Sequence, residues 1–231
     1  MGREWRDHNL QPLPFRPRRR ELDRLVTREQ FEFIKSKYGL HASWAVWADE
    51  GDTPKSNMGD LRVLDPEINK DLLSELNPNV VLVGLNISRG AIHEPFGNFH
   101  DKRPAATDFK TRFAVKNSPL WGAYMTDIIK DFDQKISGKV IKYLKKNPSF
   151  EQENVNTFYQ ELSDIGSVAP TMIAFGNITY DILQRNFKNK FQILKIPHYA
   201  SYVSKETYRE EVRSVWKSLE LATGPSMASS P

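Results

Sequence analysis

The 231-residue chain contains no cysteine, and this absence removes several classes of chemistry. It excludes disulfide bonds, thiolate nucleophiles, and zinc or iron–sulfur centres held by cysteine. The sequence also lacks a run of about 18 apolar residues, the length that a transmembrane helix needs. Its first residues lack the apolar core of a secretory signal. We therefore expect a cytoplasmic protein that does not enter a membrane.

The chain has little net charge, and that charge is unevenly placed. Lysine and arginine total 33 against 29 acidic residues, which gives +4. Residues 1–28 hold eight arginines and four acids, so the whole excess lies there. A basic segment on a neutral domain is typical of a protein that binds a polyanion, although a solvated tail has the same composition. We predict a Pro/Arg-rich arm over 1–24, one domain over 25–222 and a disordered tail over 223–231.

Buried-strand patterns alternate with helical spacing along the domain, which predicts an α/β fold with a mostly parallel central sheet flanked by helices. A long polar loop is expected over 86–103. A short helix is expected to open at Asp65-Pro66, with the proline in its first turn. The predicted strands are 41–47, 80–85, 122–129, 171–175 and 191–196, and the other predicted helices are 27–37, 140–146, 154–162, 178–187 and 204–221.

Polar residues end or directly follow four of the predicted strands. In parallel sheets, ligands bind beyond the carboxyl ends of the strands, so these residues mark a candidate cleft. The four clusters are Asn86–Arg89, Thr126-Asp127, Gly176-Asn177 and His198–Ser201.

These clusters offer complementary chemistry. The amide of Asn86 can position a water, Asp127 can accept a hydrogen bond or act as a base, and His198 can donate a proton or hydrogen bond. The segment 96–101 (FGNFHD) adds aromatic faces on which a planar ligand could stack. Each residue also has a plainer interpretation: a turn for Asn86, a cap for Asp127, a surface position for His198 and core packing for Phe99.

The order of these motifs resembles that of the uracil-DNA glycosylase superfamily. Gly84-Leu85-Asn86 looks like its first motif, closest to the Gly-Ile-Asn form of the mismatch-specific uracil/thymine glycosylases. Phe99 stands where the family has its base-stacking phenylalanine. Thr126-Asp127 matches a Thr-Asn that reads the base edge. Thr171–Gly176 resembles the element before the last motif, and His198-Tyr199-Ala200-Ser201 resembles the family's His-Pro-Ser.

The resemblance covers about residues 80–216 and includes departures. The first motif reads GLNIS and the last HYAS, both without the family's proline. The lack of cysteine excludes the branches that carry an iron–sulfur cluster. Asp127 replaces the asparagine of the uracil-reading members. An ionised carboxylate only accepts hydrogen bonds, so it suits the exocyclic amine of cytosine and repels uracil O4. If Asp127 is protonated, it mimics asparagine instead.

The resemblance implies a uracil-DNA glycosylase-like three-layer sandwich that hydrolyses the N-glycosidic bond of a flipped pyrimidine and leaves an abasic site. The base would be a modified cytosine, as some phages carry, which suggests phage defence, or else uracil. The expected partner is DNA, and the expected state is a monomer with no metal and no small-molecule cofactor. The implied catalytic residues are Asn86 and His198; the base-binding residues are Phe99, Asp127, Phe96 and Asn98; and the DNA-binding residues are Arg18, Arg19, Arg20, Arg89, Lys188, Lys190, Lys195, Tyr199, Ser201 and Tyr202.

Other classes of function remain open. The first is an inactive glycosylase-like module that binds nucleic acid or a partner. The second is a metal-dependent hydrolase, but its candidate ligands do not form a compact pattern such as H-E-x-x-H. A non-enzymatic scaffold would follow if the strand-end residues do not converge. The candidate metal ligands are His93, His100, Asp101 and His198.

Overall fold

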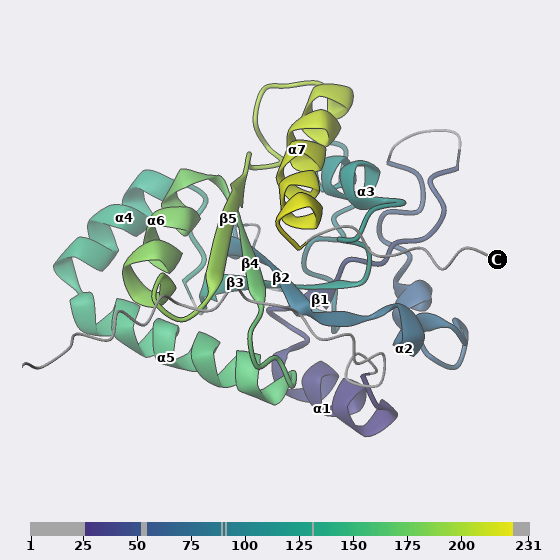
Figure 1. Cartoon of the computed structure of the whole chain (residues 1–231), viewed down its shortest axis with the longest axis horizontal. Helices are drawn as coiled ribbons and strands as arrows, with labels where there is room; N and C mark the ends of the chain where they lie inside the picture. The colour runs from purple at the N-terminus through teal and green to yellow at the C-terminus, as the bar shows by residue number, and fades with distance from the viewer. Residues whose placement is uncertain (1–25, 52–54, 89, 91, 131, 224–231) are drawn as a thin grey trace, which may run out of the picture.

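The structure is a computed structural model that describes residues 26–51, 55–88, 90, 92–130 and 132–223. Within these residues it is an α/β fold with five strands and seven α-helices (Figure 1). The strands are β1 (Ser43–Trp44), β2 (Asn77–Asn86), β3 (Ala123–Ile129), β4 (Thr171–Phe175) and β5 (Gln192–Ile196). The helices are α1 (Arg28–Tyr38), α2 (Leu72–Glu75), α3 (Phe109–Val115), α4 (Ser137–Lys146), α5 (Pro148–Asp164), α6 (Gly176–Phe187) and α7 (Lys205–Thr223), with a 3-10 turn at Leu61–Leu64.

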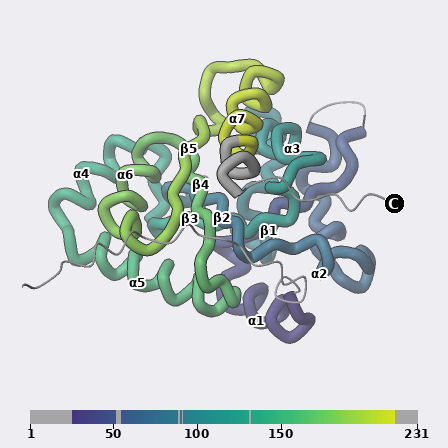
Figure 2. Tube along the Cα trace, in the orientation of Figure 1, coloured from purple at the N-terminus to yellow at the C-terminus, as the bar shows by residue number. Residues whose placement is uncertain are grey.

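The sheet is mixed but mostly parallel, in the order β1-β3-β2-β4-β5. Strands β2 to β5 run parallel to one another, and among the described strands only β1 is antiparallel, to β3. The trace passes from β3 through α4 and α5 and returns to β4, on the other side of β2 (Figure 2). The strand order therefore switches direction around β2, and the carboxyl ends of β2, β3 and β4 meet at the edge where such sheets bind ligands.

Helices cover both faces of the sheet because neighbouring strand residues point to opposite sides. On one face, Val81 and Val83 of β2 pack in a core with α1, α4, α5 and α6. On the other face, Leu82 packs with residues of α3 and α7. All seven residues of β3 are buried, as expected for a strand covered on both sides.

Most of the predicted elements are present, with boundary changes. Thr27 Oγ1 accepts the backbone N–H of Gln30 at 3.1 Å, which confirms the predicted start of α1. Ser204 Oγ caps α7 in the same way through the N–H of Thr207 at 3.1 Å. The predicted strand 41–47 is only the two-residue β1. The helix expected at Asp65-Pro66 begins instead at Leu72, because residues 65–71 form turns.

Helix α3 was not predicted from the sequence. Its buried positions include Lys110, Thr111 and Arg112, so it shows no apolar stripe. No helix of the described residues is long and apolar enough to cross a membrane. The arm predicted over 1–24 and the tail at 224–231 lie outside the described residues.

Candidate functional site

The carboxyl edges of β2 and β3 place a carboxylate directly over a glycine. Gly84 and Asp127 are opposite each other in the parallel register. A Cβ atom added to Gly84 would lie 2.1 Å from Asp127 Oδ1 and 3.4 Å from a ring carbon of Phe99. Only glycine at this position lets the buried carboxylate and the aromatic ring approach the β2 backbone so closely.

Asn98 holds this arrangement together from the loop after β2. Its Nδ2 donates to Asp127 Oδ2 at 2.9 Å and to the His41 carbonyl at 2.8 Å. Its Oδ1 accepts the backbone N–H of Phe99 at 3.2 Å. Asn98, Phe99 and Asp127 are all buried. The side chain of Asn98 is thus committed to positioning Asp127 and Phe99.

Phe99 has an unusual backbone conformation, with φ of +64°. A bulky side chain rarely adopts a positive φ, so the surrounding contacts must maintain it. Trp47 Nε1 donates to the Phe99 carbonyl at 3.3 Å. The Phe99 ring lies 6.2 Å from that of Phe175, the last residue of β4, at 30° between planes. An aromatic face is therefore fixed beside Asp127.

His198 follows β5 and reaches the same edge. A Cβ atom added to Gly176 would lie 3.5 Å from the Cβ of His198. The centroid of the His198 ring is 6.4 Å from the centroid of the Phe175 ring. The backbone N–H of Ala200 donates to His198 Nδ1 at 3.1 Å, so a neutral ring carries its proton on Nε2. The side chain is exposed, yet the protein around it desolvates the imidazole and lowers its pKa below 6.5. At neutral pH the imidazole is therefore mainly uncharged, and its Nε2–H can donate a hydrogen bond.

The loop after His198 is held by a buried lysine that no sequence pattern marks as functional. Lys110 Nζ of α3 donates to the carbonyls of Ser201 at 2.9 Å and Val203 at 2.8 Å. Tyr202, between these two anchors, is fully exposed. Tyr199 instead turns inward and packs edge-on against Phe175 at 5.3 Å. The backbone around Tyr202 is thus fixed while its ring projects into solvent.

Asn86, at the end of β2, is tied into the neighbouring loop. Its Nδ2 donates to the backbone carbonyls of Ile87 at 2.9 Å, Phe132 at 2.8 Å and Gln134 at 3.0 Å. These contacts fix the amide against the segment that follows β3. The Oδ1 atom of the same amide is the group that could hold a water.

The structure does not bring all predicted site residues together. Phe96 lies in the core, where its ring packs against Phe31 at 5.3 Å. Lys188 and Lys190 follow α6 and precede β5, so they lie at the amino edge of the sheet, away from His198. Lys195 is at the carboxyl edge, where its Nζ donates to Asn177 Oδ1 at 2.9 Å. Arg18, Arg19, Arg20 and Arg89 lie outside the described residues.

The described residues contain no cluster of three or more histidine, aspartate or glutamate side chains arranged to hold a metal ion. Among the residues considered as ligands, His100 is buried and bonded elsewhere. Its Nδ1 lies 3.0 Å from the Asn98 carbonyl and its Nε2 lies 3.1 Å from the Val46 carbonyl. The His100 ring thus lies in the interior, 5.2 Å from the ring of Trp47.

Comparison with known proteins adds no identification. No protein-family model matches the chain. Neither the curated proteins nor the solved structures include a match. The case for a function therefore depends on the motifs and on the geometry of Phe99, Asp127 and His198 at one edge of the sheet.

Proposed function

We propose that this protein is a monofunctional DNA glycosylase with a uracil-DNA glycosylase-like fold. The observation that carries the proposal is the convergence of three groups on one sheet edge. Phe99 and Asp127 both lie against Gly84 of β2, and the rings of Phe99 and His198 both contact Phe175 of β4. An aromatic face, an acceptor for a base edge and a neutral hydrogen-bond donor are what excision of a flipped pyrimidine requires.

The acceptor in the site favours a cytosine-type base. Asn98 Nδ2 already donates to Asp127 Oδ2, so that oxygen acts as an acceptor. A carboxylate oxygen can accept from the exocyclic amine of cytosine, whereas uracil O4 would face it with a lone pair. A mismatched buried polar contact costs about 1–3 kcal/mol, a preference of roughly 5- to 150-fold. We propose a modified cytosine as the substrate base, since removing ordinary cytosine would damage the host's own DNA.

The proposed reaction uses the donors and acceptors already described. The C1′–N1 bond breaks, and its electron pair passes to the base, where negative charge gathers on O2. The Nε2–H of His198 stabilises that charge, because the ring is neutral and its Nδ1 accepts from Ala200. A water held by Asn86 Oδ1 adds its oxygen to C1′. One proton of this water goes to solvent, and the released base takes up a proton from solvent.

The exposed side chain of Tyr202 is a candidate for insertion into the DNA duplex, where it would fill the gap that the flipped nucleotide leaves. Enzymes that act on one base must first extrude it, and an inserted side chain compensates for the lost stacking. Lys110 fixes the carbonyls on both sides of Tyr202, so little backbone ordering is needed on binding. Lys195, at the same edge, can contact a phosphate.

The test is incubation with duplex and single-stranded oligonucleotides that contain uracil, cytosine or 5-substituted cytosine, followed by alkali cleavage. We expect alkali-labile sites at the substituted cytosines. Asn86→Ala and His198→Ala should abolish them without loss of folding. Release of uracil alone would contradict the assignment of the base and indicate that Asp127 is protonated.

One observation favours the second candidate, a catalytically inactive module that binds nucleic acid. The Asn86 amide is held by three backbone carbonyls, a structural use that needs no catalytic role. Salt-dependent DNA binding without any abasic product in the same experiment would support this candidate over the enzyme.

A further inference from the structure

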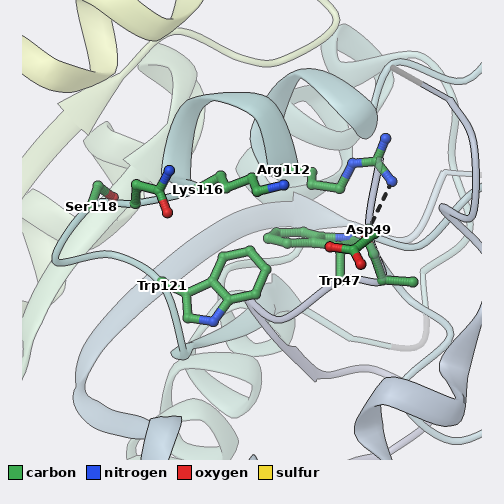
Figure 3. A pocket seen from close by; sticks show the side chains of 8 residues that line it. Trp47, Asp49, Arg112, Lys116, Ser118 and Trp121 are labelled. Carbon is green, nitrogen blue, oxygen red and sulfur yellow. Dashed lines mark hydrogen bonds between the residues drawn. The ribbon is translucent and has the colours of Figure 1, made fainter. Parts of the chain in front are cut away.

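A cavity lies away from the candidate site, between α3 and the segment after β1. It has a volume of about 360 Å³, within the range of small-ligand sites. Two indole rings, Trp47 and Trp121, line it on one side, and Arg112 and Lys116 of the α3 region lie on the other (Figure 3). Asp49 lies beside Trp47 at one end.

The two tryptophans present ring surface to this cavity. Trp47 Nε1 donates to the Phe99 carbonyl at 3.3 Å, and Trp121 Nε1 donates to Glu75 Oε2 at 3.0 Å. Both polar N–H groups are therefore engaged outside the cavity. The ring centroids are 6.0 Å apart at 56°, so the two indoles pack against each other and form one continuous aromatic wall. Such walls favour a flat, conjugated ligand.

The charges around the cavity are of both signs and occupy different places. Arg112 is buried, and its Nη1 donates to the carbonyls of Ser56 and Ala48, which fixes the guanidinium along the wall. Burial lowers the pKa of Arg112 from its usual value. The carboxylates of Glu50 and Asp49 act in the opposite direction and offset only part of this effect. Lys116 is exposed and can follow an anion at the cavity mouth. The Asp49 carboxylate can accept from an amino group on a ring.

We propose that this cavity binds a nucleotide: an aromatic base against Trp47 and Trp121, with its phosphate at Lys116. The acceptor at Asp49 favours bases with an exocyclic amine over thymine. The same chemistry is present in a free mononucleotide and in an unpaired nucleotide of single-stranded DNA. The proposal does not depend on glycosylase activity. Of the residues that carry it, only Trp47 contacts the proposed base site, where its Nε1 donates to the Phe99 carbonyl.

Calorimetric titration of the full chain tests the proposal. Deoxyadenosine 5′-monophosphate should bind saturably, while deoxyadenosine and deoxyribose 5-phosphate should each bind at least about fivefold more weakly. Thymidine 5′-monophosphate should also bind more weakly. A second titration uses an oligodeoxyadenylate. If it binds more tightly than the mononucleotide, and if the variants described below lose this binding, the ligand is single-stranded DNA. Binding of the mononucleotide alone identifies a free nucleotide.

Matched variants decide whether binding occurs in this cavity. Lys116→Gln should weaken nucleotide binding about fivefold or more, whereas Lys142→Gln, which removes an exposed lysine on α4, should not. Trp121→Ala should weaken binding and Trp121→Phe should preserve it, with melting temperatures measured for each. Equal affinity for the nucleotide and the nucleoside, equal effects of Lys116→Gln and Lys142→Gln, or no saturable binding at millimolar concentration would overturn the proposal.

Discussion

Replacing Gly84 with alanine tests the geometry of the candidate site most sharply. The new Cβ would lie 2.1 Å from Asp127 Oδ1, well inside van der Waals contact. The carboxylate must therefore move, and its 2.9 Å hydrogen bond from Asn98 Nδ2 would be lost or distorted. Losing a bond to a charged group costs about 1.5–3 kcal/mol, and overpacking adds about 1–3 kcal/mol. We expect the melting temperature to fall by roughly 5–20 °C.

The control is the same substitution at Gly138 in α4, where an added Cβ meets nothing within 4 Å. Alanine should raise helix stability there by at most about 0.5–1 kcal/mol, because Gly138 lies in the first turn of α4. Thermal unfolding of both variants, together with base excision, gives the comparison. If Gly84→Ala melts within about 2 °C of the unmodified protein and keeps its activity, the close approach of Asp127 to β2 is wrong.

Three further changes have defined outcomes. Because desolvation by the surrounding protein lowers the His198 pKa, the acid limb of kcat/KM should lie below pH 6.5. Stability should also decline as pH falls below 6.5, since the unfolded chain takes up this proton first. A limb above pH 6.5 would refute the neutral donor. Lys130→Met leaves Glu161 buried without its 2.7 Å ion pair, so the free energy of unfolding measured by chemical denaturation should fall by about 3–5 kcal/mol. Adding Glu161→Gln should restore part of this stability. An unchanged denaturation midpoint in Lys130→Met would contradict the prediction. Tyr202→Ala should leave the melting temperature unchanged but weaken DNA binding roughly 5- to 100-fold in a titration, and unchanged affinity would exclude the wedge.

The sheet was predictable from the sequence because its inner strands are continuous apolar runs. Val80–Leu85 and Thr171–Phe175 are covered on both faces, so their composition alone identifies them. Because parallel strands end at one edge, the positions of Asp127 and His198 followed from the order of elements. The ends of the two-residue β1 could not be predicted. The apolar residues on either side of it are buried although they do not pair with another strand, so the apolar pattern extends beyond the strand.

The side-chain links within the site could not be predicted. Phe96 and Phe99 are aromatic residues in one loop, both with φ of +64°. Only tertiary packing sends Phe96 to the core on one face of the sheet and Phe99 to the core on the other face, beside Asp127. Asn98 joins segments that are distant in sequence, so its partners depend on the folded loop. Lys110 looks like a surface lysine, and its role emerges only when α3 packs beside the loop before α7.

Mass analysis of the base released from DNA containing 5-substituted cytosine tests the central proposal most directly. We expect free substituted cytosine and a matching abasic site, both absent with His198→Ala. We also expect Asp127→Asn to shift release toward uracil, because the amide offers uracil a donor as well as an acceptor. DNA that binds but yields no free base from any oligonucleotide would contradict the glycosylase assignment.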